Sequence, residues 1–228
     1  MLALVGESGC GKTSTLKMIN RLVELTSGSI TVNEQNIMNL DPVRLRRSIG
    51  YVIQSIGLFP HLTVEENIAT VPKLMGWASD RIARRTEELL KLVGLNAMEF
   101  KKRRPGELSG GQQQRVGLAR ALASGPKIML MDEPFGALDP ITRSGVITEF
   151  SKIQEELSLT VILVTHDMAE ALVLADRIAV MQAGTVVALG SPFHLLSNPG
   201  NAYAEELLSM PQHQAQMLNE IMKSREES

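Results

Sequence analysis

The sequence has one cysteine, no long apolar run and no excess of either charge. Cys10 alone cannot form an intramolecular disulfide, and a single thiol in 228 residues suits a reducing compartment. Lysine and arginine number 23 against 25 aspartate and glutamate, so bulk charge gives no reason to expect a nucleic-acid partner. No apolar run approaches the roughly 18 residues that span a bilayer, and no secretory signal pattern follows Met1. We therefore expect a soluble, cytoplasmic chain that reaches a membrane only through a partner.

Three short runs are apolar throughout: Leu2–Val5, Ile128–Met131 and Val161–Val164. Such runs are typical of strands buried on both faces of a parallel sheet; a buried helix segment can look the same, but these runs are very short. Long helix-like stretches separate them, which favours an α/β sheet with right-handed crossovers. Arg177–Gln182 and Thr185–Leu189 further indicate an antiparallel hairpin.

Several helix starts can be recognised. Asp41 and Asp139 each precede a proline, as an N-cap acid before the first helical position does. Thr63 and Ser109 each begin a capping box that ends in Glu66 or Gln112. We expect four regions: core residues 1–62 and 125–190, a helical insertion at 63–124, and a helical tail at 191–228 that frays beyond Met210.

A glycine-rich segment follows the first apolar run. It reads Gly6, Glu7, Ser8, Gly9, Cys10, Gly11, Lys12 and Thr13, which matches G-x-x-x-x-G-K-[ST]. The glycines let successive backbone amides point inward toward phosphate oxygens, and a helix predicted at Ser14–Leu22 adds its positive end. Lys12 would reach the terminal phosphates and Thr13 would offer its hydroxyl to Mg²⁺. The pattern predicts nucleotide binding; a chance glycine-rich turn is the alternative.

Two other predicted strands end in residues that can act on phosphates. Asp132 and Glu133 follow Ile128–Met131, where Asp132 can hold Mg²⁺ and Glu133 can accept a proton from an attacking water. A carboxylate pair that only caps a strand is the alternative. His166 follows the third run, and ligands of open α/β sheets bind outside the carboxyl ends of the strands. The three strand ends therefore predict one shared site.

Leu108–Gln112 is a second candidate anion site. Gly110 and Gly111 leave backbone amides accessible at a helix start, and Ser109 adds a hydroxyl beside the positive helix end. A flexible helix start whose capping box is its only purpose is the alternative.

In this order the motifs resemble the ATP-binding subunits of ABC transporters. The counterparts are Walker A (Gly6–Thr13), the Q-loop (Gln54), the signature (Leu108–Gln112), Walker B with the catalytic glutamate (Ile128–Glu133), the D-loop (Ala137–Asp139) and the switch histidine (His166). The resemblance implies a P-loop NTPase (RecA-like) core with a parallel sheet, a helical subdomain insertion and a small antiparallel β part. Segments Leu16–Leu22, Ile49–His61 and Thr63–Ile68 resemble, more narrowly, the ATPases of osmoprotectant importers for glycine betaine, choline or proline.

The resemblance also implies the site. ATP would be bound by Gly6, Glu7, Ser8, Gly9, Cys10, Gly11, Lys12, Thr13, Ser14, Gln54, Asp132, Ser109, Gly110, Gly111, Gln112 and Asp139. Mg²⁺ would be held by Thr13, Gln54 and Asp132, and catalysis would depend on Glu133, His166, Gln54 and Lys12. Two copies would sandwich two ATP molecules, so that Ser109, Gly110 and Gly111 complete the site of the second copy's Lys12.

The implied partners are a second ATPase subunit, membrane permease subunits and, indirectly, a solute-binding protein, with no nucleic acid. Asp139 would lie at the dimer seam, and the stretch after Gln54 would help receive a helix of the permease. Family members normally carry a further strand and an adenine-stacking aromatic before the phosphate loop. Since Met1 is five residues before Gly6, we expect a chain that is shortened at its N-terminus, that has been given a late start codon, or that takes its adenine contact from elsewhere. A non-catalytic or soluble ABC-type nucleotide-binding module is the alternative function.

Overall fold

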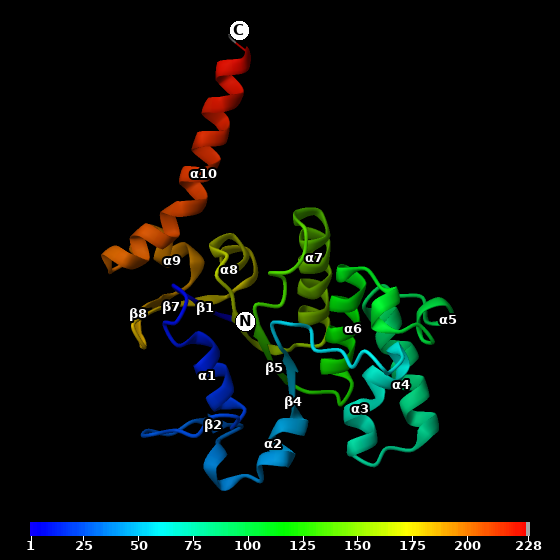
Figure 1. Ribbon diagram of the computed structural model, residues 1–228. Coiled ribbons are helices and arrows are strands. Elements are labelled where there is room, and N and C mark those ends of the chain that lie inside the picture. Colours follow the sequence, from blue (N-terminus) through cyan, green and yellow to red (C-terminus); the bar gives the residue numbers. More distant parts are fainter. Residues whose placement is uncertain (227–228) are drawn as a thin grey trace. The chain divides into compact units, whose positions relative to one another are not determined.

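The computed structural model describes residues 1–226 (Figure 1). The chain divides into two compact units, Met1–Lys12 together with the chain from Val164 onward, and Thr13–Leu163. The last two residues of the expected tail, 227–228, lie outside the described part. The region boundaries expected at residues 62, 124 and 190 stay a prediction.

The first unit combines a small sheet with three helices. Strand β1 pairs in parallel with β7, and β7 pairs antiparallel with β8, which confirms the predicted hairpin. The elements are β1 (Leu2–Val5), α8 (Met168–Leu174), β7 (Arg177–Gln182), β8 (Thr185–Gly190), α9 (Pro192–Ser197) and α10 (Ala202–Glu226).

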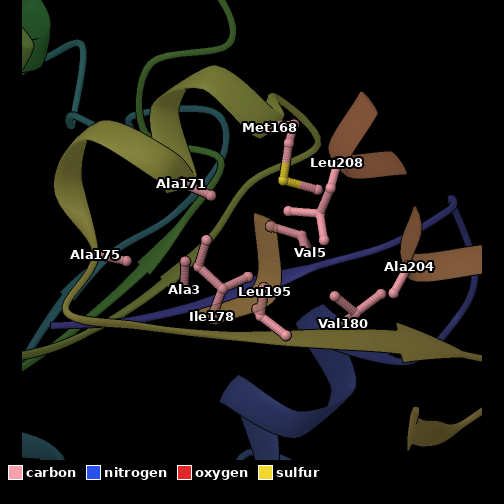
Figure 2. Packing of buried hydrophobic residues seen from close by; sticks show 10 residues of the cluster. All are labelled: Ala3, Val5, Met168, Ala171, Ala175, Ile178, Val180, Leu195, Ala204 and Leu208. Atoms are coloured by element: carbon pink, nitrogen blue, oxygen red, sulfur yellow. The ribbon is translucent and has the colours of Figure 1, made fainter. Parts of the chain in front are cut away.

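One face of this sheet is covered by the three helices (Figure 2). Ala3 and Val5 are two residues apart on β1, so both side chains point to the same face, where they join Met168 of α8 and Leu208 of α10 in one buried cluster. Burying a side chain of the size of Val5, Met168 or Leu208 stabilises a fold by about 1.5–3 kcal/mol. This packing therefore fixes the strand that leads into Gly6.

The expected C-terminal tail contains helix α10, and the fraying expected beyond Met210 stays a prediction. The helix continues to Glu226 (Figure 1). Glutamine, methionine, leucine, glutamate and lysine all have high helix propensity. The composition of this segment therefore favours a helix.

The second unit contains the remaining elements. They are α1 (Lys12–Ile19, of which Lys12 belongs to the first unit), β2 (Thr31–Val32), β3 (Gln35–Asn36), η1 (Ile37–Asn39), α2 (Pro42–Ser48), β4 (Ile49–Val52), α3 (Val64–Leu74), α4 (Ser79–Leu92), α5 (Ala97–Phe100), η2 (Pro105–Glu107), α6 (Gly110–Leu122), β5 (Ile128–Asp132), α7 (Pro140–Glu156) and β6 (Thr160–Val164). Strand β4 pairs in parallel with β5, and β6 lies on the other side of β5. Helices α3, α4 and α6 pack on one another, as expected of a helical insertion (Figure 1).

The four predicted helix starts are confirmed. Thr63 and Ser109 close capping boxes at the starts of α3 and α6. The carboxylates of Asp41 and Asp139 accept backbone N–H groups at the starts of α2 and α7, each followed by a proline. A side-chain cap of this kind is worth about 1 kcal/mol, so short polar signals set where these helices begin.

Helix α1 begins two residues earlier and ends three residues earlier than predicted. It ends because Arg21 adopts a left-handed conformation with φ 49°. The Leu22 amide then donates to the Lys17 carbonyl at 2.8 Å, and the Arg21 amide donates to the Met18 carbonyl at 3.0 Å. This is the Schellman arrangement, which normally uses glycine, so an arginine at this position did not indicate the end of the helix.

Strand β4 and the β2–β3 hairpin were not predicted. Gly50 lies inside β4, where glycine usually weakens a strand. A Cβ at Gly50 would lie 2.8 Å from the Ala121 carbonyl oxygen, so the missing side chain lets α6 approach the sheet. None of the helices among the described residues combines the length with the hydropathy that a membrane span requires.

Candidate functional site

The phosphate loop, Gly6–Lys12, curls back after β1. Gly6, Gly9 and Gly11 have φ values of 146°, 83° and 106°, conformations that favour glycine. A Cβ at Gly6 would lie 2.1 Å from the Met181 carbonyl oxygen, so this position also needs glycine for space. The sequence therefore dictates a curled loop at the end of β1.

Lys12 is held inside this loop. Its side chain is 6% exposed. The ammonium donates to the carbonyl of Gly6 at 2.7 Å and to that of Glu7 at 2.9 Å, and the Cys10 Sγ lies 3.7 Å away. A buried ammonium needs such acceptors to offset the loss of water. The contacts hold a positive charge against the backbone of the loop, which suits phosphate binding.

Two contacts brace the loop from the rest of the first unit. The Gly184 amide, in the β7–β8 turn, donates to the Cys10 carbonyl at 3.1 Å. The Glu7 amide donates to the Tyr203 hydroxyl of α10 at 2.7 Å. Sequence reasoning missed Tyr203, because nothing in the pattern near residue 203 indicates a contact with residue 7.

His166 is exposed on the turn between β6 and α8. The backbone amide of its neighbour Thr165 donates to the Leu4 carbonyl at 3.2 Å. Leu4 is two residues before Gly6, so the turn that carries the imidazole is tied to the strand that carries the phosphate loop. This agrees with the expectation that both lie at carboxyl ends of strands.

In the second unit, Thr13 lies against Asp132. The Thr13 hydroxyl donates to Asp132 Oδ1 at 2.9 Å, and Asp132 is 5% exposed. Burial raises the pKa of the neighbouring Tyr51 phenol, and the negative charge of Asp132 raises this pKa further. Two candidate oxygen ligands for Mg²⁺, which are far apart in the sequence, thus lie side by side, as predicted.

Gln54 contacts Glu133. Its Nε2 donates to Glu133 Oε2 at 2.8 Å. Glu133 is half-buried and adopts φ 45°, in the left-handed region that non-glycine residues rarely occupy. This backbone conformation turns the chain sharply after β5 and presents the carboxylate to the Gln54 amide.

The donor set fits Mg²⁺. Thr13 and Asp132 offer oxygen ligands, which this cation prefers. The part of the chain that the structure describes has no cluster of three or more His, Cys, Asp or Glu side chains suited to a metal. A cation held here would therefore depend on phosphate oxygens for further ligands, which is usual for Mg²⁺. A direct role for Gln54 as a ligand stays a prediction.

The signature turn, Leu108–Gln112, is held by two hydrogen bonds between Ser109 and Gln112. The Ser109 hydroxyl accepts the Gln112 amide at 3.3 Å, and the Gln112 side-chain oxygen accepts the Ser109 amide at 2.9 Å. Gly111 lies against α7, since a Cβ there would come within 2.4 Å of Thr142 Cγ2. Helix α6 therefore presents its first turn beside the start of α7.

Asp139 lies at that same start of α7. Its carboxylate accepts the Thr142 amide at 3.1 Å, and hydrogen bonds from Thr142 hold the pKa of Asp139 below its usual value. Ser109, Asp139 and Gly110 are exposed. The two motifs that were predicted to face a second copy thus share one surface of the second unit.

The comparisons with known proteins agree with these motifs. A family model described as ABC transporter matches residues 1–136. The chain is 56% identical over 207 residues to the glycine betaine/carnitine/choline transport ATP-binding protein OpuCA of Bacillus subtilis. It is 54% identical over 203 residues to the osmoprotectant import ATP-binding protein OsmV of Salmonella typhimurium. These matches cover 91% and 89% of this chain but 54% and 53% of the relatives, so the chain spans about half their length.

A solved structure gives the same result. The dimeric ATP-binding cassette MJ0796 bound to ADP and Pi is 35% identical, with a TM-score of 0.74, over 84% of this chain and 85% of that chain. The α/β P-loop fold and the order of its motifs are therefore those of an ATP-binding cassette. This chain belongs to the ABC transporter family.

Proposed function

We propose that this chain is the ATP-hydrolysing subunit of an ABC importer, in which ATP-driven dimer closure drives uptake of a small solute. The observation that carries the proposal is that one chain contains three features. These are a curled phosphate loop that binds the Lys12 ammonium, the Thr13–Asp132 contact and the Gln54–Glu133 contact. A nucleotide-binding module without turnover needs the first feature but gives no reason for the second and third.

Hydrolysis is proposed to proceed by in-line attack of a water on the γ-phosphoryl group of ATP. Glu133 accepts the proton of that water, and such general-base catalysis is worth about 10²–10⁴ in rate. Because Gln54 donates to one carboxylate oxygen of Glu133, the base is held in a fixed orientation. His166 positions the γ-phosphate or the water.

Charge on the phosphates is stabilised by fixed groups. Lys12 and the loop amides bind the phosphate oxygens, and this kind of preorganised electrostatic stabilisation dominates phosphoryl transfer. Thr13 and Asp132 would hold Mg²⁺, which would supply positive charge against the phosphates. The chain itself holds Thr13 Oγ1 and Asp132 Oδ1 2.9 Å apart before the nucleotide binds.

The active unit is proposed to be a dimer of two ATP-binding subunits, with identical subunits as the simplest form. Ser109, Gly110 and Gly111 of one copy complete the ATP site of the other, and Asp139 lies at the seam. The neighbouring position of these residues on one surface supports this role. Closure would depend on ATP and be lost with ADP, which gives a two-state motion that a partner can follow.

A cleft beside the Gln54 loop suits contact with a membrane subunit. It has a volume of about 320 Å³ and includes Tyr51, Phe59, Val71 and Arg120. The Arg120 guanidinium donates to the Ile56 carbonyl at 2.7 Å and also to that of Gly57, which fixes the loop after Gln54. Phe59 is 42% exposed at the cleft. We propose that an apolar helix end of the permease docks here and places the chain on the inner face of the membrane.

The proposed solute is an osmoprotectant such as glycine betaine, choline or proline. The names of the relatives, which include glycine betaine, carnitine and choline transport, support this class. A solute-binding protein would deliver the solute to the permease, and the ATPase would not touch it.

Turnover and transport are tested separately. The purified chain is expected to release phosphate from ATP in the presence of Mg²⁺. Reconstituted with its permease in vesicles, it should drive ATP-dependent uptake of labelled glycine betaine, choline or proline. ATP binding without turnover, alone and with the permease, would favour the non-catalytic module; turnover without uptake of any of the three would overturn the solute class.

A further inference from the structure

A buried carboxylate, that of Glu170, has no part in the reaction proposed above. Glu170 lies in α8 and is 6% exposed, and its neighbour Ala171 is part of the apolar cluster shown in Figure 2. A carboxylate at such a place is costly unless it is hydrogen-bonded. Glu170 Oε2 accepts the hydroxyl proton of Thr165, itself 2% exposed, at 2.7 Å.

The Thr165 hydroxyl links this carboxylate to the backbone next to His166. Its oxygen accepts the Asp167 amide at 3.0 Å. A hydroxyl has one proton, so donation to Glu170 fixes the rotation of that group and directs its lone pairs toward the Asp167 amide. Without Glu170, nothing in this pair of contacts would set which way the hydroxyl points.

Both flanks of His166 are therefore fixed. On one side the Thr165 amide donates to the Leu4 carbonyl of β1 at 3.2 Å. On the other side Asp167 Oδ1 accepts the amides of Ala169 at 2.9 Å and Glu170 at 3.3 Å. The residue between these anchors carries an exposed imidazole. Because the backbone on both sides of His166 is hydrogen-bonded, the turn can hold the His166 side chain in one orientation.

We propose that Glu170 is a positioning residue, which acts through the Thr165 hydroxyl to hold the His166 turn so that the imidazole meets the γ-phosphate of bound ATP. The proposal rests on the proposed function, since only there does His166 contact substrate. A misplacement of about 1 Å in such a group can cost about a hundredfold in rate. A carboxylate that only satisfies a buried hydroxyl would matter for folding and not for the imidazole.

Thr165→Val and Thr165→Ser form the matched pair for the test. Valine has nearly the same shape but no hydroxyl, while serine keeps it. We expect Thr165→Val to lower kcat for ATP hydrolysis by about ten- to a hundredfold with KM for ATP unchanged, and Thr165→Ser to keep nearly the wild-type kcat. Glu170→Gln, which keeps an acceptor oxygen, should lose less than Glu170→Ala. If Glu170→Ala does not fold, the two Thr165 variants carry the test.

A second readout follows the imidazole itself. In the isotope-labelled chain, NMR of the histidine side chains can be assigned by comparison with His166→Asn. We expect Thr165→Val to shift or broaden the His166 signal while the signals of His61 and His194 stay in place. A lower melting temperature with equal loss of kcat in the Val and Ser variants and an unchanged His166 signal would overturn the proposal. A wild-type chain without turnover would instead contradict the proposed function, and the NMR comparison would still test the link between Thr165 and His166.

Discussion

Two glycine-rich segments precede helices in this chain, and they are built differently. In the phosphate loop, three glycines adopt positive φ and the chain curls around the Lys12 ammonium. In the signature turn, Gly110 and Gly111 already belong to the first turn of α6, and Ser109 and Gln112 hydrogen-bond each other.

The difference shows that glycine serves two purposes here. In the phosphate loop it permits a backbone conformation and lets amides and a lysine converge, so this loop can surround phosphates by itself. At Gly111 it removes volume, because a Cβ would meet Thr142 Cγ2 at 2.4 Å. The signature turn offers only an exposed helix start, which fits a site completed by the nucleotide of another copy.

The largest expected effect is at Lys12. Lys12→Ala removes the buried cation of the phosphate loop, and we expect ATP hydrolysis to fall by at least a factor of about 10²–10³, the loss seen when one preorganised stabilising group is removed. Phosphate release and nucleotide titration measure this. Lys17→Ala, on the exposed side of the same helix, is the control, and equal losses in both variants would deny Lys12 its special role.

The signature glycines can be separated from each other. Gly111→Ala forces a methyl group against Thr142 and should destabilise the chain by about 1–3 kcal/mol, as overpacking does. Gly110→Ala brings its methyl group only to 3.7 Å from Leu138, so its stability should be nearly that of wild type. Denaturant melts measure both. A Gly111→Ala chain as stable as Gly110→Ala would remove the argument from volume.

Ser109 can be compared with Thr63, because both close capping boxes with the same 3.3 Å contact. Ser109→Ala and Thr63→Ala should each cost about 1 kcal/mol of stability. Only Ser109→Ala should also slow hydrolysis, since Thr63 is outside the proposed ATP site. The comparison needs a melt and an ATPase assay on each variant; equal activities would leave Ser109 with a purely structural role.

The smallest effect is expected at Asp139. Hydrogen bonds from Thr142 lower the pKa of its carboxyl below 3.8. The charged form is thus favoured in the folded chain, so its contribution is present above the unfolded pKa and is lost as the pH falls through the folded one. Asp139→Asn should therefore lower stability slightly at pH 7, and its difference from wild type should disappear as the pH falls below about 4. Unfolding curves between pH 2 and 7 that superimpose on wild type would contradict this.

Local signals in the sequence predicted much of the fold. Apolar runs located β1, β5 and β6, and the caps at Asp41, Thr63, Ser109 and Asp139 located four helix starts. Each depends on residues adjacent in the chain. The end of α1 at Arg21 and the strand that contains Gly50 were missed, because backbone strain and close packing decide them.

The motifs predicted which residues form the site, but they did not predict the contacts that support those residues. The motifs predicted that Thr13 and Asp132 lie at one site, and their side chains are in contact in the structure. The pattern did not indicate that Tyr203 lies beside Glu7 or that Glu170 contacts Thr165, the residue before His166. Tyr203 and Glu170 themselves belong to no motif, so only the folded chain reveals these two contacts.

The central claim is that two copies share each ATP, and Glu133→Gln tests it most directly. The glutamine can still accept the Gln54 amide but cannot take a proton from water, so ATP should stay bound. Light scattering with saturating ATP and Mg²⁺ should then find a stable dimer of Glu133→Gln, which ADP does not support, while the exposed control Glu156→Gln keeps hydrolysing ATP. A Glu133→Gln chain that binds ATP and remains monomeric would contradict the account.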